Sequence, residues 1–288
     1  MTTAKTRAYA ERFNRVFDYI DQHLDGDLSV EQLSRVANFS KYHFHRQFYE
    51  YAGINVSRYI QLIRMRRASY RLVFSEQTRI IDIAMDAGFE NPESFSRAFK
   101  NLFGQSPSAF RKHPAWQPWH EQYRVPKLPR SQIMQVTIIE FSETPVAAYE
   151  HRGPMEQVND SARVFIDWRK QSGLSPVNTS RTFGIAYGNP ETTPPEDFRF
   201  DICGSIEAAV PDNPQGVINK TIPAGRCAVV RHHGPHDRIG ESAYYLYREW
   251  LPQSGEELRD FPLFFHYLNL MPDTPEHELI TDVYLPLK

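Results

Sequence analysis

Apolar residues in the first 113 positions recur every three to four residues, which predicts short amphipathic helices. Two stretches repeat one pattern, Ala37-Asn38-Phe39-Ser40 onward and Ala87-Gly88-Phe89 onward. The repeated positions are Phe44, Arg46, Phe48, Gly53 and Tyr59 in the first stretch, and Phe95, Arg97, Phe99, Gly104 and Phe110 in the second. The offset is 50 residues before the turn and 51 after it, so one residue is inserted after Phe89.

Each stretch predicts a helix-turn-helix. Ser40 and Asn91 are suited to cap the amino terminus of the second helix, and Gly53 and Gly104 are suited to end it. The paired phenylalanines lie four residues apart and therefore share a buried face, which leaves one arginine per motif on the opposite face. Between the motifs, residues 56–74 lack Gly and Pro and predict one rigid helix.

Helical hairpins of this kind also occur in all-α domains that do not bind DNA. Two copies that each present an arginine at the same helical position favour DNA binding. Arg46 and Arg97 are candidates for bidentate contact with guanine. The spacer would span about 28 Å, close to the roughly 34 Å between successive major-groove faces. Five further basic residues are equally suited to contact phosphate or to be plain solvated charges: Lys41, Arg64, Arg67, Lys100 and Arg111.

Residues 9–113 resemble the AraC/XylS family of transcription regulators, most specifically from Gly88-Phe89 through Arg97-Ala98-Phe99-Lys100 to Pro107, Phe110 and Arg111. The resemblance implies base contacts from Tyr42 and Arg46, and from Glu93, Ser96 and Arg97. Glu93 departs from the uncharged polar residue that many members have. The full set of predicted DNA-binding residues is Ser40, Lys41, Tyr42, His43, Arg46, Gln47, Asn91, Glu93, Ser96, Arg97 and Lys100.

Composition divides the 288-residue chain into two parts. Residues 1–113 hold 17 Lys and Arg against 12 Asp and Glu, whereas residues 131–288 hold 13 against 22. This split fits a nucleic-acid module joined to a different one. No long apolar segment is present, so we expect a soluble, cytoplasmic protein without membrane contact. The only two cysteines, Cys203 and Cys227, are expected to be buried free thiols, and no cofactor or metal is expected.

We predict three regions: an all-α DNA-binding domain over residues 1–113, a proline-rich linker over residues 114–132, and an α+β domain over residues 133–288. Trp116 and Trp119 in the linker are expected to pack on a domain surface. Beyond it, short alternating runs predict strands. The predicted strands are Met134 to Ile138, Val146 to Tyr149, Phe198 to Ile206, Arg226 to Arg231 and Leu279 to Leu285.

A second repeat occurs in this half. The run His151-Arg152-Gly153-Pro154 matches His232-His233-Gly234-Pro235 at an offset of 81 residues, and Gln171-Ser172-Gly173 matches Gln253-Ser254-Gly255 at 82. Each copy reads as strand, Gly-Pro turn and amphipathic helix, which predicts two similar strand-helix-strand units. The histidines near Gly234 are expected to cap backbone groups in the turn, with a metal or catalytic site as the alternative.

Residues 133–288 resemble the GyrI-like effector-binding domain, through the two His-Xaa-Gly-Pro turns, Trp250 and the run from Pro262 to Pro286. The resemblance implies a cavity for lipophilic, often cationic, small molecules. Phe265 stands where the family's usual glutamate is expected, so a buried cation would lack its counter-ion and we expect an apolar effector. The predicted effector-binding residues are Tyr149, Trp168, Tyr187, Tyr244, Tyr247, Trp250 and Phe265, each of which is also a plausible ordinary core aromatic.

The sequence therefore predicts a multidomain, non-enzymatic transcription regulator that binds double-stranded DNA and an apolar small-molecule effector, with RNA polymerase as a further candidate partner. Two alternatives stay open for the second half. One is a hydrolase of small electrophiles, for which Glu150, Asp201 or Glu207 would have to replace the missing glutamate as general acid or base. The other is an acidic protein-docking module without a small ligand.

Overall fold

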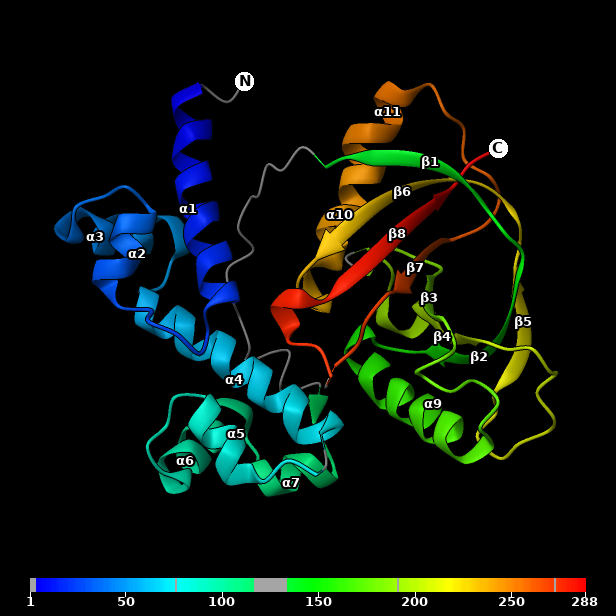
Figure 1. Ribbon diagram of the computed structural model, residues 1–288, viewed down its shortest axis with the longest axis horizontal. Helices are drawn as coiled ribbons and strands as arrows, with labels where there is room; N and C mark the ends of the chain where they lie inside the picture. The colour runs from blue at the N-terminus through cyan, green and yellow to red at the C-terminus, as the bar shows by residue number, and fades with distance from the viewer. Residues whose placement is uncertain (1–3, 76, 117–133, 191, 272) are drawn as a thin grey trace. The chain divides into compact units, whose positions relative to one another are not determined.

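The computed structural model describes residues 4–75, 77–116, 134–190, 192–271 and 273–288. It divides into two compact units, residues 1–133 and residues 134–288 (Figure 1). Of the predicted linker, residues 117–132 lie outside the described residues, Trp119 among them. Within the described part of the chain, no helix is long and apolar enough to cross a bilayer.

The first unit is helical. Its helices are α1 (Ala4–Gln22), α2 (Val30–Val36), α3 (Lys41–Ala52), α4 (Val56–Phe74), α5 (Ile80–Asp86), α6 (Pro92–Phe103) and α7 (Pro107–Lys112). The pairs α2–α3 and α5–α6 form the two helix-turn-helix motifs, as predicted. The intervening helix α4 has the predicted bounds.

The caps of α3 and α6 explain where these helices begin and end. The Ser40 hydroxyl accepts from the backbone N–H of His43 at 3.4 Å, and the Asn91 side chain accepts from that of Ser94 at 2.8 Å. Gly53 and Gly104 then end the helices with φ of 72° and 74°, a left-handed conformation that glycine adopts without strain. The predicted caps are confirmed.

The helix α4 connects two hydrophobic cores. Its first half, including Val56 and Tyr59, packs with α1, α2 and α3 around Phe44 and Phe48. Its second half packs with α5, α6 and α7 around a second core. That core includes Leu62, Met65, Leu72, Val73, Phe95, Phe99, Phe103, Phe110 and Trp116. Trp116 contacts the Phe110 ring edge-on with centroids 5.1 Å apart, which confirms that it packs on the domain. One helix therefore carries both motifs.

The second unit is built on one eight-stranded antiparallel sheet. Its strands are β1 (Val136–Phe141), β2 (Thr144–Arg152), β3 (Thr182–Ala186), β4 (Arg199–Ser205), β5 (Ile218–Ile222), β6 (Gly225–His233), β7 (Leu263–Tyr267) and β8 (Ile280–Pro286). Their order is β1-β6-β8-β7-β3-β4-β2-β5. The five predicted strands correspond to β1, β2, β4, β6 and β8, whereas β3, β5 and β7 were not predicted.

The sheet displays the duplication directly. Strands β2, β3 and β4 correspond to β6, β7 and β8 at an offset of 81 residues. Exchanging each strand for its counterpart reverses the strand order, so the two halves are related by an approximate two-fold axis between β3 and β7. The leading strands are exchanged: β1 precedes the first half but pairs with β6 of the second, and β5 precedes the second half but pairs with β2 of the first.

Two-residue connections join β1 to β2 and β5 to β6, although the strands of each pair lie far apart in the sheet order. The sheet must therefore curl so that its two ends approach each other. Its inner face encloses one core that includes Phe141, Phe183, Cys203, Cys227 and Phe264. Both cysteines are buried free thiols, as predicted.

The outer face of the sheet is covered by helices. Helix α9 (Val158–Ser172) packs on β2 and β4, and α10 (Ile239–Tyr245) packs on β6 and β8 (Figure 1). A π-helical segment η4 (Leu246–Trp250) continues α10 into α11 (Leu251–Ser254). A π turn accommodates one inserted residue, and the repeat offset changes from 81 to 82 across this segment. The short 3₁₀ turns are η1 (Met155–Gln157), η2 (Pro195–Asp197), η3 (His236–Arg238) and η5 (Glu276–Glu278).

Candidate DNA interface and effector domain

Helix α3 presents a polar face opposite its buried phenylalanines. Tyr42 projects fully from it, with 91% of its surface exposed. The remaining predicted residues of this motif lie on the same side: Ser40, Lys41, His43 and Arg46 are exposed, and Gln47 is half-buried. The Arg46 guanidinium therefore lies outside the hydrophobic interior, as a base-reading arginine requires.

Helix α6 presents the equivalent face. Arg97 is exposed, and its guanidinium donates weakly to the Ser94 hydroxyl at 3.5 Å. The other predicted residues share its side of the helix: Asn91, Glu93 and Lys100 are exposed, and Ser96 is half-buried. Glu93 and Arg97 lie one helical turn apart, so a carboxylate and a guanidinium are presented together.

Three arginines that were candidates for phosphate contact or free solvation have internal partners instead. Arg64 donates from Nε and Nη2 to the Leu24 carbonyl oxygen at 3.1 and 2.9 Å. Arg67 forms a two-pronged pair with Asp25. Arg111 donates to the carbonyl oxygens of Leu72 at 3.1 Å and Thr78 at 2.7 Å. Buried carbonyls at helix ends need donors, and long guanidinium side chains reach them.

Arg64 is also partly desolvated. Burial lowers its pKa from the usual value, an effect that the nearby Asp25 carboxylate opposes. The guanidinium stays charged at neutral pH, since the usual pKa of arginine is above about 12. Lys41 and Lys100 are exposed, and their contact with phosphate stays a prediction.

In the second unit, Phe265 lies on the helix-covered face of β7. It is buried with Leu246 and Trp250 in a cluster beneath α10. Phe265 pairs directly with Gly184 of β3. A Cβ atom at position 184 would lie 2.4 Å from Phe200 Cζ and 2.9 Å from the Tyr267 hydroxyl, so the glycine leaves room for two aromatic rings at the approximate two-fold axis.

The structure brings several predicted effector residues to this face. Trp168 is a buried residue of α9 that stacks on Phe165 at a centroid distance of 5.5 Å, and Tyr149 of β2 packs against the same cluster. Trp250 and Phe265 lie beneath α10. Phe200 contacts both groups and stacks on Phe265 at 6.2 Å. These aromatic side chains therefore form one continuous layer between the helices and the sheet.

Tyr187 is not brought together with Phe265. Side chains alternate along β3, so Tyr187 follows Phe183 and Ile185 on the inner face of the sheet. Its hydroxyl donates to Asp201 at 2.7 Å, and the Arg199 guanidinium lies over its ring at 4.5 Å. Tyr247 is 40% exposed and belongs to neither of the two clusters that form the layer.

Tyr244 joins the two halves on the helix side. Its hydroxyl donates to the Asn189 side chain at 2.8 Å, which connects α10 of the second half with the loop that follows β3 of the first. The Arg248 guanidinium lies 4.1 Å from the centre of its ring. This ring therefore already has a cationic partner from the chain itself.

A charged network occupies the inner face of the first half. Lys220 of β5 donates to Asp201 and to Glu150, both at 2.6 Å. Burial alone would lower the pKa of Lys220, but the hydrogen bonds that it donates to both carboxylates outweigh this effect and raise the pKa. The bond from Lys220 also lowers the pKa of Glu150. Two carboxylates that were considered as catalytic substitutes are therefore engaged with one ammonium group, and Glu207 is exposed.

The two His-Xaa-Gly-Pro turns have matching geometry. His151 Nδ1 lies 2.8 Å from the Ser161 hydroxyl and its Nε2 lies 3.1 Å from the Pro154 carbonyl oxygen. His232 makes the corresponding contacts to Ser242 at 3.2 Å and to Pro235 at 3.2 Å. A ring nitrogen bonded to a carbonyl must carry the proton, so the serine donates to the other nitrogen. Both histidines thus cap backbone groups, and the expectation for the histidines near Gly234 is confirmed for His232.

His236, which was also expected to cap a backbone group in this turn, does not do so through Nε2. Its ring lies against Tyr267 with centroids 4.8 Å apart, and its buried Nε2 has no hydrogen-bond partner. Burial lowers its pKa to about 4. Phe200 and Tyr267 were also missed, although the alternation of apolar residues in β4 and β7 could have placed both beside Phe265. Within the described residues, no group of three His, Cys, Asp or Glu side chains is arranged to hold a metal ion.

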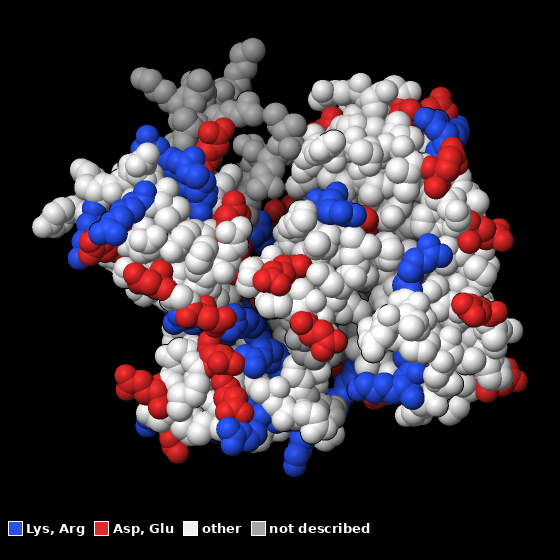
Figure 2. Space-filling model, viewed as in Figure 1, with Lys and Arg blue, Asp and Glu red and all other residues white. Residues whose placement is uncertain are grey.

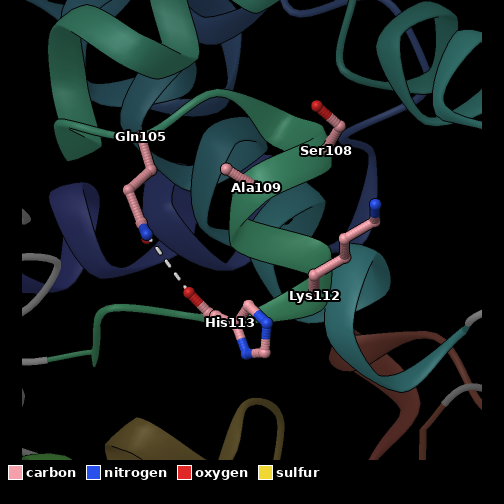
Figure 3. Close-up of a pocket in the computed structure, with 5 residues that line it drawn as sticks. All are labelled: Gln105, Ser108, Ala109, Lys112 and His113. Atoms are coloured by element: carbon pink, nitrogen blue, oxygen red, sulfur yellow. Dashed lines mark hydrogen bonds between the residues drawn. The ribbon is translucent and has the colours of Figure 1, made fainter.

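A shallow depression of about 390 Å³ lies on the first unit beside α7. Its lining residues are Gln105, Ser108, Ala109, Lys112 and His113 (Figure 3). The Gln105 amide spans it by donating to the His113 carbonyl oxygen at 3.1 Å. None of these residues was predicted to bind DNA or effector.

On the face shown in Figure 2, acidic and basic side chains are interspersed on both units, so the charge split of the sequence is not visible there as two single-sign surfaces.

The comparisons with known proteins agree with this architecture. Residues 134–288 match the family model of the GyrI-like small molecule binding domain, and residues 33–113 match a helix-turn-helix domain. The chain is 51% identical over 154 residues to the probable transcriptional regulator YgiV of Escherichia coli, which is 54% of this chain and 96% of that protein. It is 38% identical over 103 residues to the uncharacterized HTH-type transcriptional regulator YbfP of Bacillus subtilis, 36% of this chain and 35% of that protein.

The crystal structure of the EcmrR C-terminal domain superposes with a TM-score of 0.47 and 17% identity, covering 55% of this chain and 99% of that one. The matched relatives are described as transcriptional regulators. With two helix-turn-helix motifs on α4 and a duplicated α+β domain, the chain belongs to the GyrI-like small molecule binding family and carries an AraC-type helix-turn-helix domain, which makes it a DNA-binding transcription regulator.

Proposed function

We propose that this regulator reads one bipartite DNA site with both motifs of a single chain. The observation that carries the proposal is the matched placement of Arg46 and Arg97. Each lies at the same position on the exposed face of its recognition helix, and α4 carries both helices. Bidentate contact of each arginine with a guanine would distinguish its base by about 1–3 kcal/mol.

Selection of random duplex DNA by the full-length chain tests this proposal. The expected product contains two conserved half-sites whose centres lie about one helical turn, or roughly 10 base pairs, apart. Scrambling either half-site should then weaken binding at least tenfold. A selected site with one short conserved block, unaffected by Arg46→Ala or by Arg97→Ala, would contradict the proposal.

For the second unit, we propose that a neutral apolar effector binds on the helix-covered face, beside the aromatic layer of Phe200, Phe265 and Trp250. Two observations favour a neutral molecule over a cation. Phe265 supplies no counter-charge at the centre of the layer, and the Tyr244 ring faces Arg248. A cation placed there would lose its hydration without gaining a carboxylate partner.

Native mass spectrometry of the purified chain, followed by identification of any released compound, tests the effector proposal. A co-purified neutral aromatic or aliphatic molecule supports it, provided that Phe265→Ala changes its occupancy. Retention of cations by the wild-type chain contradicts it. Contact with RNA polymerase stays a prediction, which transcription in vitro with and without the chain would test.

A further inference from the structure

Arg64 is distinguished by its contacts with both halves of the DNA-binding unit. It lies near the middle of α4, and two of its guanidinium nitrogens donate to the Leu24 carbonyl oxygen beyond the end of α1. Leu24 belongs to the core of the first half. On its other side, Nη1 lies against Gly88 in the turn of the second motif, since a Cβ atom at Gly88 would be only 2.6 Å away.

Two other arginines of α4, Arg67 and Arg71, each pair with one carboxylate. Arg67 pairs with Asp25 of the first half. Arg71 pairs with Asp86 of the second half at 2.5 Å. Arg71 attaches α4 to the half that this part of the helix already packs against. Arg67 reaches back to the first half, but its partner Asp25 is an exposed carboxylate, whereas Arg64 is held by a backbone carbonyl and lies against the turn of the second motif. Arg67 and Arg71 therefore serve as matched controls for Arg64.

At Gly88 a side chain would displace the Arg64 guanidinium, whereas the turn itself accepts a side chain. Gly88 has φ of 82°, and the equivalent residue of the first motif, Asn38, has φ of 55°. Asparagine tolerates this left-handed conformation. The first motif thus makes the same turn with a side chain present. The feature peculiar to Gly88 is the guanidinium that occupies the space a Cβ would need.

We propose that Arg64 is a positioning residue that fixes the orientation of the two recognition helices relative to each other, and through it the half-site spacing that the chain accepts. This inference rests on the proposed bipartite reading of DNA. A planar guanidinium whose Nε and Nη2 both donate to one carbonyl oxygen has a defined orientation, so packing Gly88 against it restricts rotation of the second half about α4.

The test uses the full-length chain and the bipartite duplex selected with it, together with the same duplex carrying one or two inserted base pairs between the half-sites. The wild-type chain should bind the lengthened duplexes at least tenfold more weakly. In Gly88→Asn and Arg64→Met, this difference should shrink to less than about threefold, with weaker binding at the original spacing. Asn38→Gly, Arg67→Met and Arg71→Met should keep the tenfold difference.

Gly88→Asn is expected to fold, because Asn38 shows that the turn accepts this residue. Arg64→Lys keeps a donor for the Leu24 carbonyl without the planar fork, and should give an intermediate spacing preference. The inference is overturned if Gly88→Asn and Arg64→Met melt cooperatively and still discriminate spacing as the wild type does. A wild-type chain that is indifferent to both spacing and the loss of one half-site instead refutes bipartite reading itself.

Discussion

Gly184 and Phe265 pair directly across strands β3 and β7, and they occupy the same position in the two halves of the domain. The approximate two-fold axis passes through this pair. A symmetric pair of large side chains would collide with Phe200 and the Tyr267 hydroxyl, because a Cβ at position 184 already lies within 3 Å of both. Because the repeats differ at this point, Phe265 is the only side chain of the pair, and it determines the polarity and charge at the approximate two-fold axis.

Phe265→Glu should convert the domain to one that binds lipophilic cations. The new carboxylate would supply the counter-charge that the aromatic layer lacks, so tetraphenylphosphonium should bind at least tenfold more tightly than to the wild type, as measured by isothermal titration calorimetry. Phe265→Gln introduces a side chain of the same shape as glutamate but without the charge, and should show no gain in affinity for tetraphenylphosphonium. Equal affinities of the two variants would contradict the electrostatic explanation. Both variants should lose about 3 kcal/mol of stability through loss of the buried ring.

Arg97→Ala should relax the preference at one base position, at a cost of about 1–3 kcal/mol for the preferred base. Lys100→Ala should weaken binding to all sequences alike and reduce the slope of log affinity against log salt by about one. Repeating the duplex selection and a salt titration with both variants distinguishes these effects. A uniform loss with Arg97→Ala would show that Arg97 contacts phosphate rather than a base.

Lys220→Met should destabilise the second unit by about 3 kcal/mol at pH 7, because it leaves Asp201 and Glu150 as uncompensated neighbouring carboxylates. The lowered pKa of Glu150 contributes stability above its unfolded-state pKa of about 4.3, and this contribution is lost in the variant. Urea unfolding should show a smaller penalty at pH 5, where a carboxylate can accept a proton. Lys288→Met, which removes an exposed pair with Glu257, is the control and should have little effect. A penalty independent of pH would argue for lost packing instead.

The half-buried His236, whose Nε2 is buried without a partner, should make the second unit less stable in acid. Its folded-state pKa of about 4 lies below the unfolded value of about 6.5, so the unfolded chain binds more protons between these limits. Its contribution is complete above pH 6.5 and is lost as the pH falls towards 4, by up to about 3 kcal/mol. His236→Gln should reduce this dependence in thermal melts at pH 7 and pH 5. His233→Gln, at an exposed site in the same turn, should not.

Local sequence signals were sufficient for much of the fold. Caps such as Ser40 and Asn91 lie beside the helices that they begin, so they can be identified from sequence. The repeat offsets predicted the two motifs and the two halves, and the shift from 81 to 82 corresponds to the π segment from Leu246 to Trp250. Contacts between distant segments were beyond such signals. Whether Arg64 or Arg111 meets solvent or a carbonyl oxygen depends on segments about 40 residues away.

The candidate effector residues likewise divide into those that the sequence could place and those whose position depends on contacts between distant segments. Trp250 and Phe265 were singled out by the resemblance to the GyrI-like family, and the structure places both in one cluster on the helix-covered face, while their binding of an effector stays a prediction. Tyr187 was grouped with them by residue type, but the register of β3 places it on the other face of the sheet, with Asp201. Its strand was too short and too rich in small residues to be predicted, so its side-chain alternation could not be used.

The exchange of β1 and β5 between the halves bears on how such a domain can arise and how it can be divided. In a polypeptide with only one repeat, the leading strand would have no partner strand to pair with, because each leading strand pairs with the other repeat. Two such polypeptides could exchange their leading strands, and this domain swap would form the same sheet as a homodimer. Fusion of two copies end to end would retain that interlacing within a single molecule, and cutting the chain between β4 and β5 should yield fragments that associate rather than two independent folding units.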